Sequence, residues 1–134
     1  MVDLKWYKIS NIDFENDVPN GTQLKLKNSV KYNVNYMDAE RRCVSKLEFR
    51  IGDENLQPFS IKLEMEAMFT YDEFDEKPYI HTASFDHLFP FIRQSVNSLT
   101  TMAGMPGLLI PLMKLEENEV ALGKPKEETE EPLN

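Results

Sequence analysis

Three segments of the chain alternate apolar and polar side chains with a period of two, and this alternation constrains the fold more than any other feature. The segments span residues 24–36, 43–51 and 59–71. Successive side chains of a β-strand point to opposite faces of the sheet, so this period indicates strands that are buried on one face. Short turns join the three segments, whereas parallel strands would need connections of about a dozen residues. We therefore predict an antiparallel meander of three long strands.

A fourth strand is predicted near the start of the chain. Residues 4–14 are rich in aromatic and β-branched side chains, although their alternation is imperfect. Residues 16–21 then supply Asn, Asp, Pro and Gly, which favour a loop for conformational reasons. Because this loop is longer than the other turns, we place the first strand at an edge of the sheet.

A single long helix is predicted over residues 86–103. Asp86 is suited to capping free main-chain amides, Pro90 would lie inside the first turns, and Gly104 would end the helix. Apolar side chains fill an arc of roughly 160° on the helical wheel, wider than the roughly 100° stripe of a single core contact. The arc consists of Phe85, Leu88, Phe89, Phe91, Ile92, Val96, Leu99, Met102 and Ala103. The helix should therefore be covered on more than one side, and it alone is long enough to cover the apolar face of the sheet. The predicted fold class is α+β.

The opposite face of the predicted helix is polar but almost without charge. Apart from Arg93, it carries Pro90, Gln94, Asn97, Ser98, Thr100 and Thr101. Helix faces in contact with water normally carry charged side chains. Short neutral polar side chains instead suit a face that is pressed against another polar surface.

A strongly apolar segment follows the helix, between and beyond Pro106 and Pro111. It has no helical period, and the prolines favour an extended chain. Its apolar side chains either pack on the sheet or line a groove. Methionines gather around it, and their flexible thioethers suit either an irregular core or a surface that accepts many partners. The residues that we single out as a candidate binding surface are Met105, Leu108, Leu109, Ile110 and Met113.

Charge divides the chain into a body and a tail. The net charge is −8, of which residues 116–134 contribute −5 through seven Glu and two Lys. We therefore predict one domain over residues 1–115 and an acidic tail, 116–134, that is disordered in isolation. The negative balance argues against binding nucleic acid through its phosphates. Residues 1–10 lack the basic and then apolar order of a signal peptide, and the chain contains no run of about 18 apolar residues. We therefore expect a soluble cytoplasmic protein without membrane insertion.

Residues that could support catalysis or bind a metal do not form a recognisable pattern. Ser84, His81, His87 and Asp86 lie close in sequence, but no nucleophile elbow precedes a helix and no third group orients a base. The two histidines lack the spacing of a helical metal pair, and no glycine-rich phosphate loop is present. Cys43 has no partner for a disulfide or a zinc site and is expected to be a half-buried strand residue. We predict no enzyme, no cofactor and no metal.

The region from residue 88 to residue 111 resembles the SecB protein-export chaperones and their SecB-like relatives. It shares with them a leucine-phenylalanine-proline-aromatic helix start, an arginine three residues after the proline, and a glycine-x-proline-x-leucine-leucine segment after the helix. The matching residues are Leu88, Phe89, Pro90, Phe91, Arg93, Gly104, Pro106, Leu108, Leu109 and Pro111. A weaker match near the start comprises Ile12, Phe14, Glu15, Pro19 and Asn20. The resemblance covers residues 5–112.

The resemblance implies a four-stranded antiparallel sheet with a long helix, assembled as a dimer of dimers through the helix and the first strand. It also implies that the protein holds unfolded precursors for the translocation motor SecA. The neutral helix face would then be the surface where two dimers meet, which makes Gln94, Asn97, Ser98 and Thr101 candidate interface residues. Phe14 and Trp6 are added to the candidate client surface.

The chain also departs from the family pattern. Residues 16–18 lengthen the first loop, and residues 112–122 replace the usual start of a second helix, which should be short or altered. Of the acids that would contact the motor, Glu15 and Glu64 match, whereas Asn11 and Lys62 do not carry the expected acid and leucine.

Function follows from the resemblance as an expectation with alternatives. We predict a homotetrameric, ATP-independent holdase chaperone that binds unfolded or precursor polypeptides for export, with SecA as a potential partner. The first alternative is a SecB-like chaperone dedicated to one partner, such as an antitoxin or a phage product. The second alternative is a ligand-binding or structural oligomer with the same fold.

Overall fold

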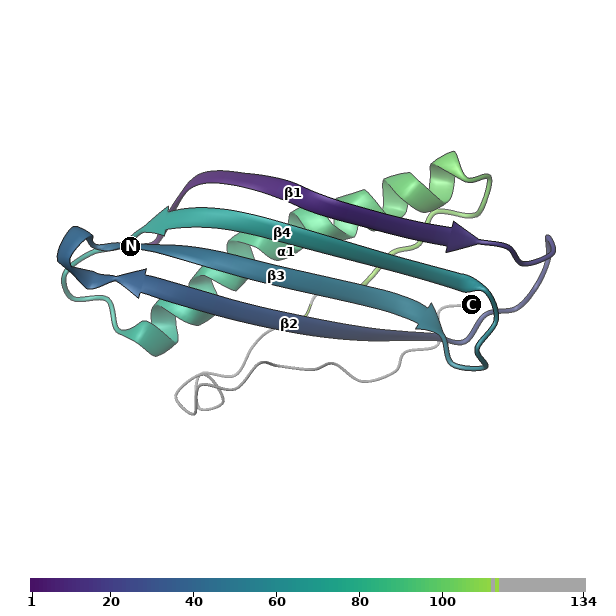
Figure 1. Ribbon diagram of the computed structural model, residues 1–134, viewed down its shortest axis with the longest axis horizontal. Helices are drawn as coiled ribbons and strands as arrows, with labels where there is room; N and C mark the ends of the chain where they lie inside the picture. Colours follow the sequence, from purple (N-terminus) through teal and green to yellow (C-terminus); the bar gives the residue numbers. More distant parts are fainter. Residues whose placement is uncertain (112, 114–134) are drawn as a thin grey trace.

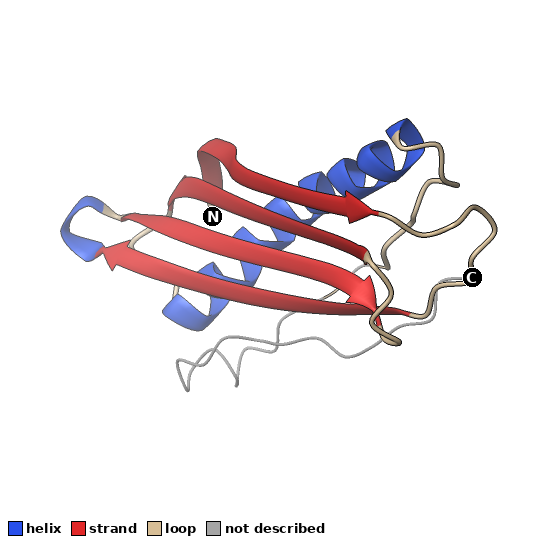
Figure 2. Ribbon diagram, turned by 45° about the vertical axis from the view of Figure 1, so that its right-hand side comes forward, coloured by secondary structure: helices blue, strands red, loops and turns tan. Residues whose placement is uncertain are grey.

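The computed structural model describes residues 1–111 and 113 of the chain. Four strands form one antiparallel sheet in the order β1-β4-β3-β2, and one long helix lies against it (Figures 1 and 2). The elements are β1 (Asp3–Asn16), β2 (Leu26–Met37), the short 3-10 helix η1 (Asp38–Glu40), β3 (Arg42–Asp53), β4 (Phe59–Thr70) and α1 (Lys77–Met102). The predicted α+β class, the antiparallel meander and the edge position of the first strand are confirmed. The predicted second helix, at residues 112–122, lies outside the described residues except for Met113.

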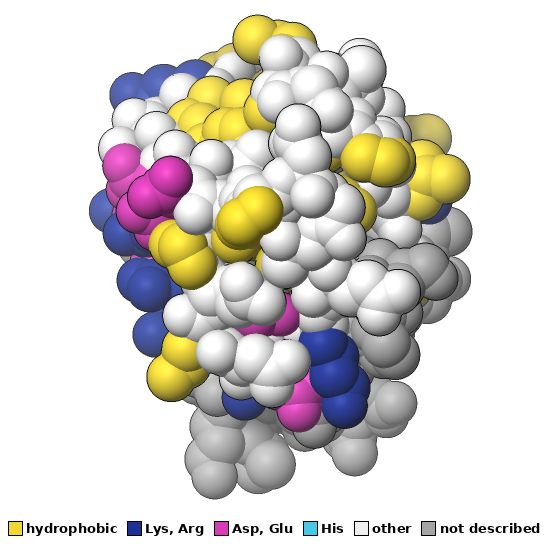
Figure 3. All heavy atoms as spheres, turned by 90° about the vertical axis from the view of Figure 1, so that its right-hand side faces the viewer, with side chains coloured by type: hydrophobic (Ala, Val, Ile, Leu, Met, Phe, Trp, Pro, Cys, Tyr) yellow, Lys and Arg dark blue, Asp and Glu magenta, His cyan; other side chains and the backbone are white. Residues whose placement is uncertain are grey.

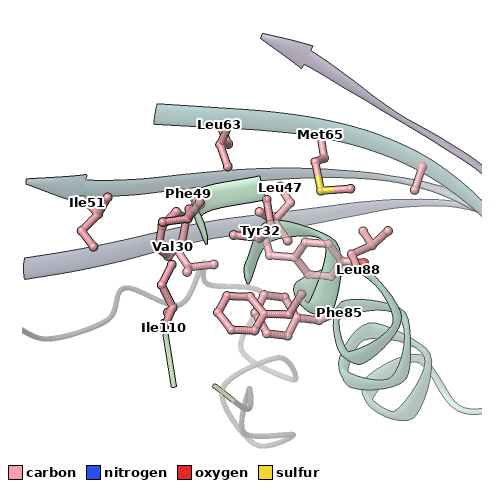
Figure 4. Packing of buried hydrophobic residues seen from close by; sticks show 14 of the residues in the cluster. Val30, Tyr32, Leu47, Phe49, Ile51, Leu63, Met65, Phe85, Leu88 and Ile110 are labelled. Atoms are coloured by element: carbon pink, nitrogen blue, oxygen red, sulfur yellow. The ribbon is translucent and has the colours of Figure 1, made fainter. Parts of the chain in front are cut away.

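The apolar face of the sheet forms most of the core. Residues that pair directly across antiparallel strands lie on the same face, and Phe49 pairs with Leu63 as Leu47 pairs with Met65. All four side chains are essentially inaccessible to solvent. They pack toward aromatic side chains of α1, with Phe85 and Phe89 stacked on each other (Figure 4). The face on which the sheet meets the helix is called the inner face below, and the opposite face is called the outer face.

Two irregularities in β1 explain its imperfect alternation. The pairing of β1 with β4 shifts register between Leu4 and Trp6 and again between Ile9 and Asn11. Each shift inserts one extra residue, as in a β-bulge, and exchanges the two faces of the strand. Leu4 and Ile9 consequently lie opposite inner-face residues of β4, whereas Trp6 lies opposite Met68 on the outer face.

The predicted start of the helix is wrong, whereas its end is nearly right. The helix begins at Lys77, nine residues before the predicted start at residue 86, and Pro78 is the proline of its first turn. Pro90 lies in the helix interior, where it removes one main-chain N–H from the hydrogen-bond ladder. Ile80 and Phe85 are fully buried, so packing in the core extends the helix toward the N-terminus beyond its predicted start.

The helix covers only part of the inner face. It crosses the sheet obliquely, starting on the β2 side and ending beyond β1 (Figures 1 and 2). After Met102 the chain turns back, and Ile110 contributes a fully buried side chain to the core. The segment after the helix is therefore a second cover of the sheet.

Candidate functional site

Residues 104–110, which we call the strap, fold back along the helix that precedes them. Gly104 has a φ of 85°, a left-handed conformation that glycine adopts without strain and that reverses the chain at a helix end. The N–H of Met105 donates to the carbonyl of Thr100, 3.0 Å away. The strap then runs antiparallel to α1, because Gly107 lies beside Thr101 whereas Ile110 lies beside Arg93, two turns earlier.

Three polar side chains of the helix hold the main chain of the strap. Arg93 donates from Nε to the carbonyl of Ile110 at 2.6 Å, and Asn97 donates from Nδ2 to the carbonyl of Leu108 at 3.1 Å. The N–H of Leu108 donates to Oγ1 of Thr100 at 3.0 Å. Residues four and three positions apart lie on the same side of a helix, so these side chains form one row. We call Arg93, Asn97 and Thr100 the polar row.

The contact between the strap and the polar row is closest at Gly107. A Cβ atom at this position would lie 2.6 Å from Nδ2 of Asn97 and 2.8 Å from Oγ1 of Thr101. Neither distance is compatible with a side chain on residue 107 unless the strap or the helix side chains move. Glycine is therefore required here by close approach and not by its backbone conformation.

The side chains of the strap alternate between the core and the solvent. Ile110 is fully buried and points toward the sheet near Val30 and Phe49 (Figure 4), whereas Leu109 is 74% exposed. Leu108, Met105 and the following Met113 are half-buried.

The structure thus divides the five apolar residues predicted for this surface. Leu109 faces solvent, Ile110 belongs to the core, and three lie at the boundary. Met102, at the last turn of the helix, adds a further side chain that is 82% exposed. Hydrophobic side chains form several separate patches on the end of the molecule shown in Figure 3.

The two aromatic residues added to the predicted client surface lie on opposite faces of the sheet. Phe14 is on the inner face, where its ring meets the ring of Phe59 edge-on at 6.1 Å. Trp6 lies on the outer face beside Met68 and is 43% exposed. The sheet therefore separates Trp6 from the strap, because the first bulge of β1 reverses the orientation of its side chain.

The predicted interface residues also occupy different positions. Asn97 lies under the strap, whereas Gln94, Ser98 and Thr101 are exposed on the helix. Thr100, which the sequence placed on the same polar face, is fully buried. The surface that covers part of this face belongs to the same chain.

Glu15 and Glu64, the candidate motor contacts, are both on the outer face. They come from the adjacent strands β1 and β4 and point away from α1. Glu15 is exposed, and Glu64 forms an ion pair with Lys62 at 2.9 Å. Ion pairs of this kind continue across the face, since Lys62 also lies 3.9 Å from Glu48.

The residues considered for catalysis occupy different environments on α1. Ser84 is fully buried; its hydroxyl lies 2.6 Å from the hydroxyl of Tyr32 and 3.0 Å from the carbonyl of His81. The ring of His81 meets the ring of Tyr32 edge-on at 5.0 Å, and burial lowers the pKa of His81 to about 4. Asp86 and His87 are exposed.

The described residues contain no cluster of His, Cys, Asp or Glu that could hold a metal ion. Cys43 is fully buried rather than half-buried as predicted, because β3 lies in the interior of the sheet, and burial raises the pKa of its thiol to about 11.

Within residues 1–111, no helix has the length and apolar character to cross a bilayer.

Sequence reasoning missed the roles of Arg93, Thr100 and Gly107. The signal was present as a neutral helix face followed by an extended segment with glycine and proline. We interpreted that face as a contact with another subunit, because no local pattern shows that a chain folds back on its own helix.

Solved structures with a similar fold include the two described here. The first is the SecB-like chaperone Rv1957 of Mycobacterium tuberculosis, in complex with a ChAD peptide from the antitoxin HigA1. It has a TM-score of 0.66 and 19% identity over 86% of this chain and 92% of that chain. The second is a protein of unknown function from Streptococcus agalactiae, with a TM-score of 0.56 and 16% identity over 84% of this chain and 98% of that chain. No protein-family model and no curated protein sequence matches this chain.

Proposed function

The chain has the SecB-like fold, and from this premise we propose that it is an ATP-independent chaperone that holds unfolded polypeptides. The observation that carries the proposal is the strap. It presents Leu109 to solvent from an extended backbone, and the flexible side chains of Met102, which is exposed, and Met105, which is half-buried, flank the turn at which the strap begins. Exposed apolar groups concentrated in one segment are typical of partner sites. Methionine allows such a surface to fit side chains of different shapes.

Holding a polypeptide in this way needs no catalytic step and no cofactor. Each Å² of apolar client surface removed from water contributes roughly 25 cal/mol. An extended client can also form main-chain hydrogen bonds, which do not depend on its sequence. Binding of this kind suits clients that share only the property of being unfolded.

A chaperone dedicated to one partner is the second candidate. The structure of the Mycobacterium tuberculosis chaperone contains a peptide from an antitoxin, which favours an antitoxin as the kind of partner to test. A ligand-binding or structural oligomer is the third candidate and predicts no binding of unfolded proteins. Binding to several unrelated unfolded proteins separates the first candidate from the other two.

The proposed assembly is a tetramer made of two dimers. The edge strand β1 carries exposed apolar side chains on both faces, Tyr7 and Ile12 on the inner face and Trp6 on the outer face. Proteins usually protect long edge strands with charge or cover, so this edge is suited to pairing with a second copy. The exposed neutral residues Gln94, Ser98 and Thr101 would then contribute to the contact between dimers.

Export and the motor are the most specific parts of the proposal. We include SecA as a partner that would contact Glu15 and Glu64, and the cytoplasm as the location where precursors are held. Replacing both glutamates with lysine should weaken binding to SecA while leaving client binding intact. Equal SecA binding by the wild type and this double variant would remove these residues from the site.

The basic proposal is tested by direct binding. A reduced and carboxymethylated protein, which cannot refold, is labelled with a fluorophore and titrated with the chain in the absence of ATP. The proposal predicts that the labelled protein binds saturably and that the native form of the same protein does not compete with it. No binding at concentrations up to about 100 μM, a free energy of roughly −5.5 kcal/mol, would contradict it.

A further inference from the structure

Among the described residues, the polar row presents its hydrogen-bonding groups to main-chain atoms and not to side chains. Arg93 and Asn97 donate to carbonyl groups, and Thr100 accepts from an N–H. Arg93 has no carboxylate partner within residues 1–111, so its charged donor is directed at a peptide carbonyl. Recognition of this kind is independent of side-chain identity.

The strap also uses the pattern by which extended peptides are bound. Side chains of an extended chain alternate, so every second one can enter a pocket. Ile110 enters the core completely, Leu109 points to solvent, and Leu108 is half-buried. The strap is therefore held by hydrogen bonds to its main chain and by the burial of every second side chain in an apolar environment.

We infer that the polar row and the socket of Ile110 form a binding site for an extended polypeptide, which the strap occupies in competition with clients. The ligand class is a segment of extended chain with apolar residues at alternate positions. This inference rests on the proposed function and adds to the exposed surface at Leu109 a second site, beneath the strap, with an internal competitor. The argument for the occupant is the strap itself, which has this chemistry and is already seated there.

The close contact at Gly107 gives a way to loosen the strap with one methyl group. A Cβ atom on residue 107 would overlap the end of the Asn97 side chain, so either the strap or Asn97 must move, and either movement weakens the hydrogen bond between Asn97 and Leu108. Gly107→Ala should therefore loosen the strap and make the site more accessible. Gly21→Ala is the matched control. Gly21→Ala also strains the main chain, because Gly21 has a φ of 84°, but the added Cβ atom would have no other atom within 4 Å.

The probe is a fluorescein-labelled synthetic peptide with the sequence of residues 104–113, measured by fluorescence anisotropy. The Gly107→Ala protein should bind it at least about tenfold more tightly than the wild type and the Gly21→Ala protein, because the competing strap is loosened. A peptide with serine in place of Leu108 and Ile110 should lose this affinity. Adding Asn97→Leu to Gly107→Ala should also abolish the gain, since it removes a donor to the main chain.

Equal affinity of the folded Gly107→Ala protein and the wild type for the peptide would overturn the inference. If the Gly107→Ala protein changes its native mass but does not bind the peptide, the inference is also wrong, and the polar row would instead contact a second copy of the chain. If Gly107→Ala fails to fold, hydrogen exchange in the wild type decides. The amide of Leu108 should exchange faster when the carboxymethylated protein is bound, and unchanged or slower exchange would contradict the inference.

These outcomes are separable from failure of the proposed function. Binding of the carboxymethylated protein by the wild type, together with no effect of Gly107→Ala, would leave the chaperone proposal standing and remove only the competing strap. If the wild type and both glycine variants bind neither the unfolded protein nor the peptide, both proposals are wrong.

Discussion

The ring of Tyr7 on β1 stacks on the ring of Phe91 on α1, with centroids 4.3 Å apart and planes at 19°. This contact joins the edge strand to the helix at a point where both are incompletely buried. In the proposed assembly, the same two elements meet other copies of the chain. The pair therefore lies at the junction between the fold of one subunit and its association with others.

We expect Tyr7 and Phe91 to stabilise the fold jointly. A double-mutant cycle with Tyr7→Leu and Phe91→Leu should give a coupling free energy of about 0.5–1.5 kcal/mol, the usual range for aromatic pairs. The measurement is urea denaturation at a protein concentration that leaves the oligomeric state unchanged. Additive effects of the two substitutions would show that the stacked geometry contributes nothing beyond burial.

Leu109→Asp should weaken client binding with little loss of stability. Leu109 is mostly exposed, so the new charge remains hydrated, whereas Leu63→Asp buries a charge in the core and should cost more than about 4 kcal/mol. Leu56→Asp, at a 91% exposed position in the turn between β3 and β4, is the control for the added charge. The affinity for a carboxymethylated protein should fall at least about fivefold for Leu109→Asp and remain unchanged for Leu56→Asp. Equal affinities of the two variants would move the client surface away from the strap.

Charge on the exposed neutral residues of α1 should separate dimers. Gln94 and Ser98 are four residues apart and solvent-exposed, and neither is needed to hold the strap. Gln94→Glu combined with Ser98→Glu places like charges across a symmetric contact, so native mass should fall from tetramer to dimer. A tetramer that persists at low ionic strength would exclude this face from the contact.

Stability should fall as the pH drops from about 6.5 toward 4 because of His81. Burial lowers the pKa of His81 from 6.5 to about 4 in the folded chain. Between these values the unfolded chain takes up a proton that the folded chain does not, so the free energy of unfolding decreases with falling pH. His81→Phe, measured by urea denaturation across this range, should lose that part of the pH dependence. Parallel curves for the wild type and the variant would show that His81 is accessible to protons in the folded state.

Removal of residues 124–134 should leave folding unchanged. This part of the acidic tail lies outside the described residues, and its composition offers almost nothing to bury. The melting temperature of the truncated protein should stay within about 2 °C of the full chain. A decrease of more than a few degrees would show that the tail packs on the body.

The strands were predictable because their signal is local. Alternation in β2, β3 and β4 directly reports one buried face, and the short turns leave antiparallel pairing as the only connection. The bulges of β1 were not predictable, because a shift of register depends on its pairing with β4 and leaves in the sequence only an irregular alternation. The sequence alone therefore did not show that Trp6 lies on the face of the sheet opposite to the strap.

The helix shows where local signals compete. Pro78 and Pro90 are both compatible with a first turn, and only packing of Ile80 on the sheet decides for the earlier one. The contact between Asn97 and the strap was beyond local reasoning altogether. A neutral helix face predicts that something covers it, but not whether the cover is another subunit or the next segment of the same chain.

The most direct test of the central claim is suppression of aggregation without ATP. Three unrelated proteins are unfolded and diluted into buffer with an equimolar amount of the chain, and light scattering is followed, with the Leu109→Asp variant as a comparison. The account predicts that the wild type suppresses scattering of all three proteins and that the variant does so less effectively. Unreduced scattering of all three proteins in the presence of the wild type would contradict it.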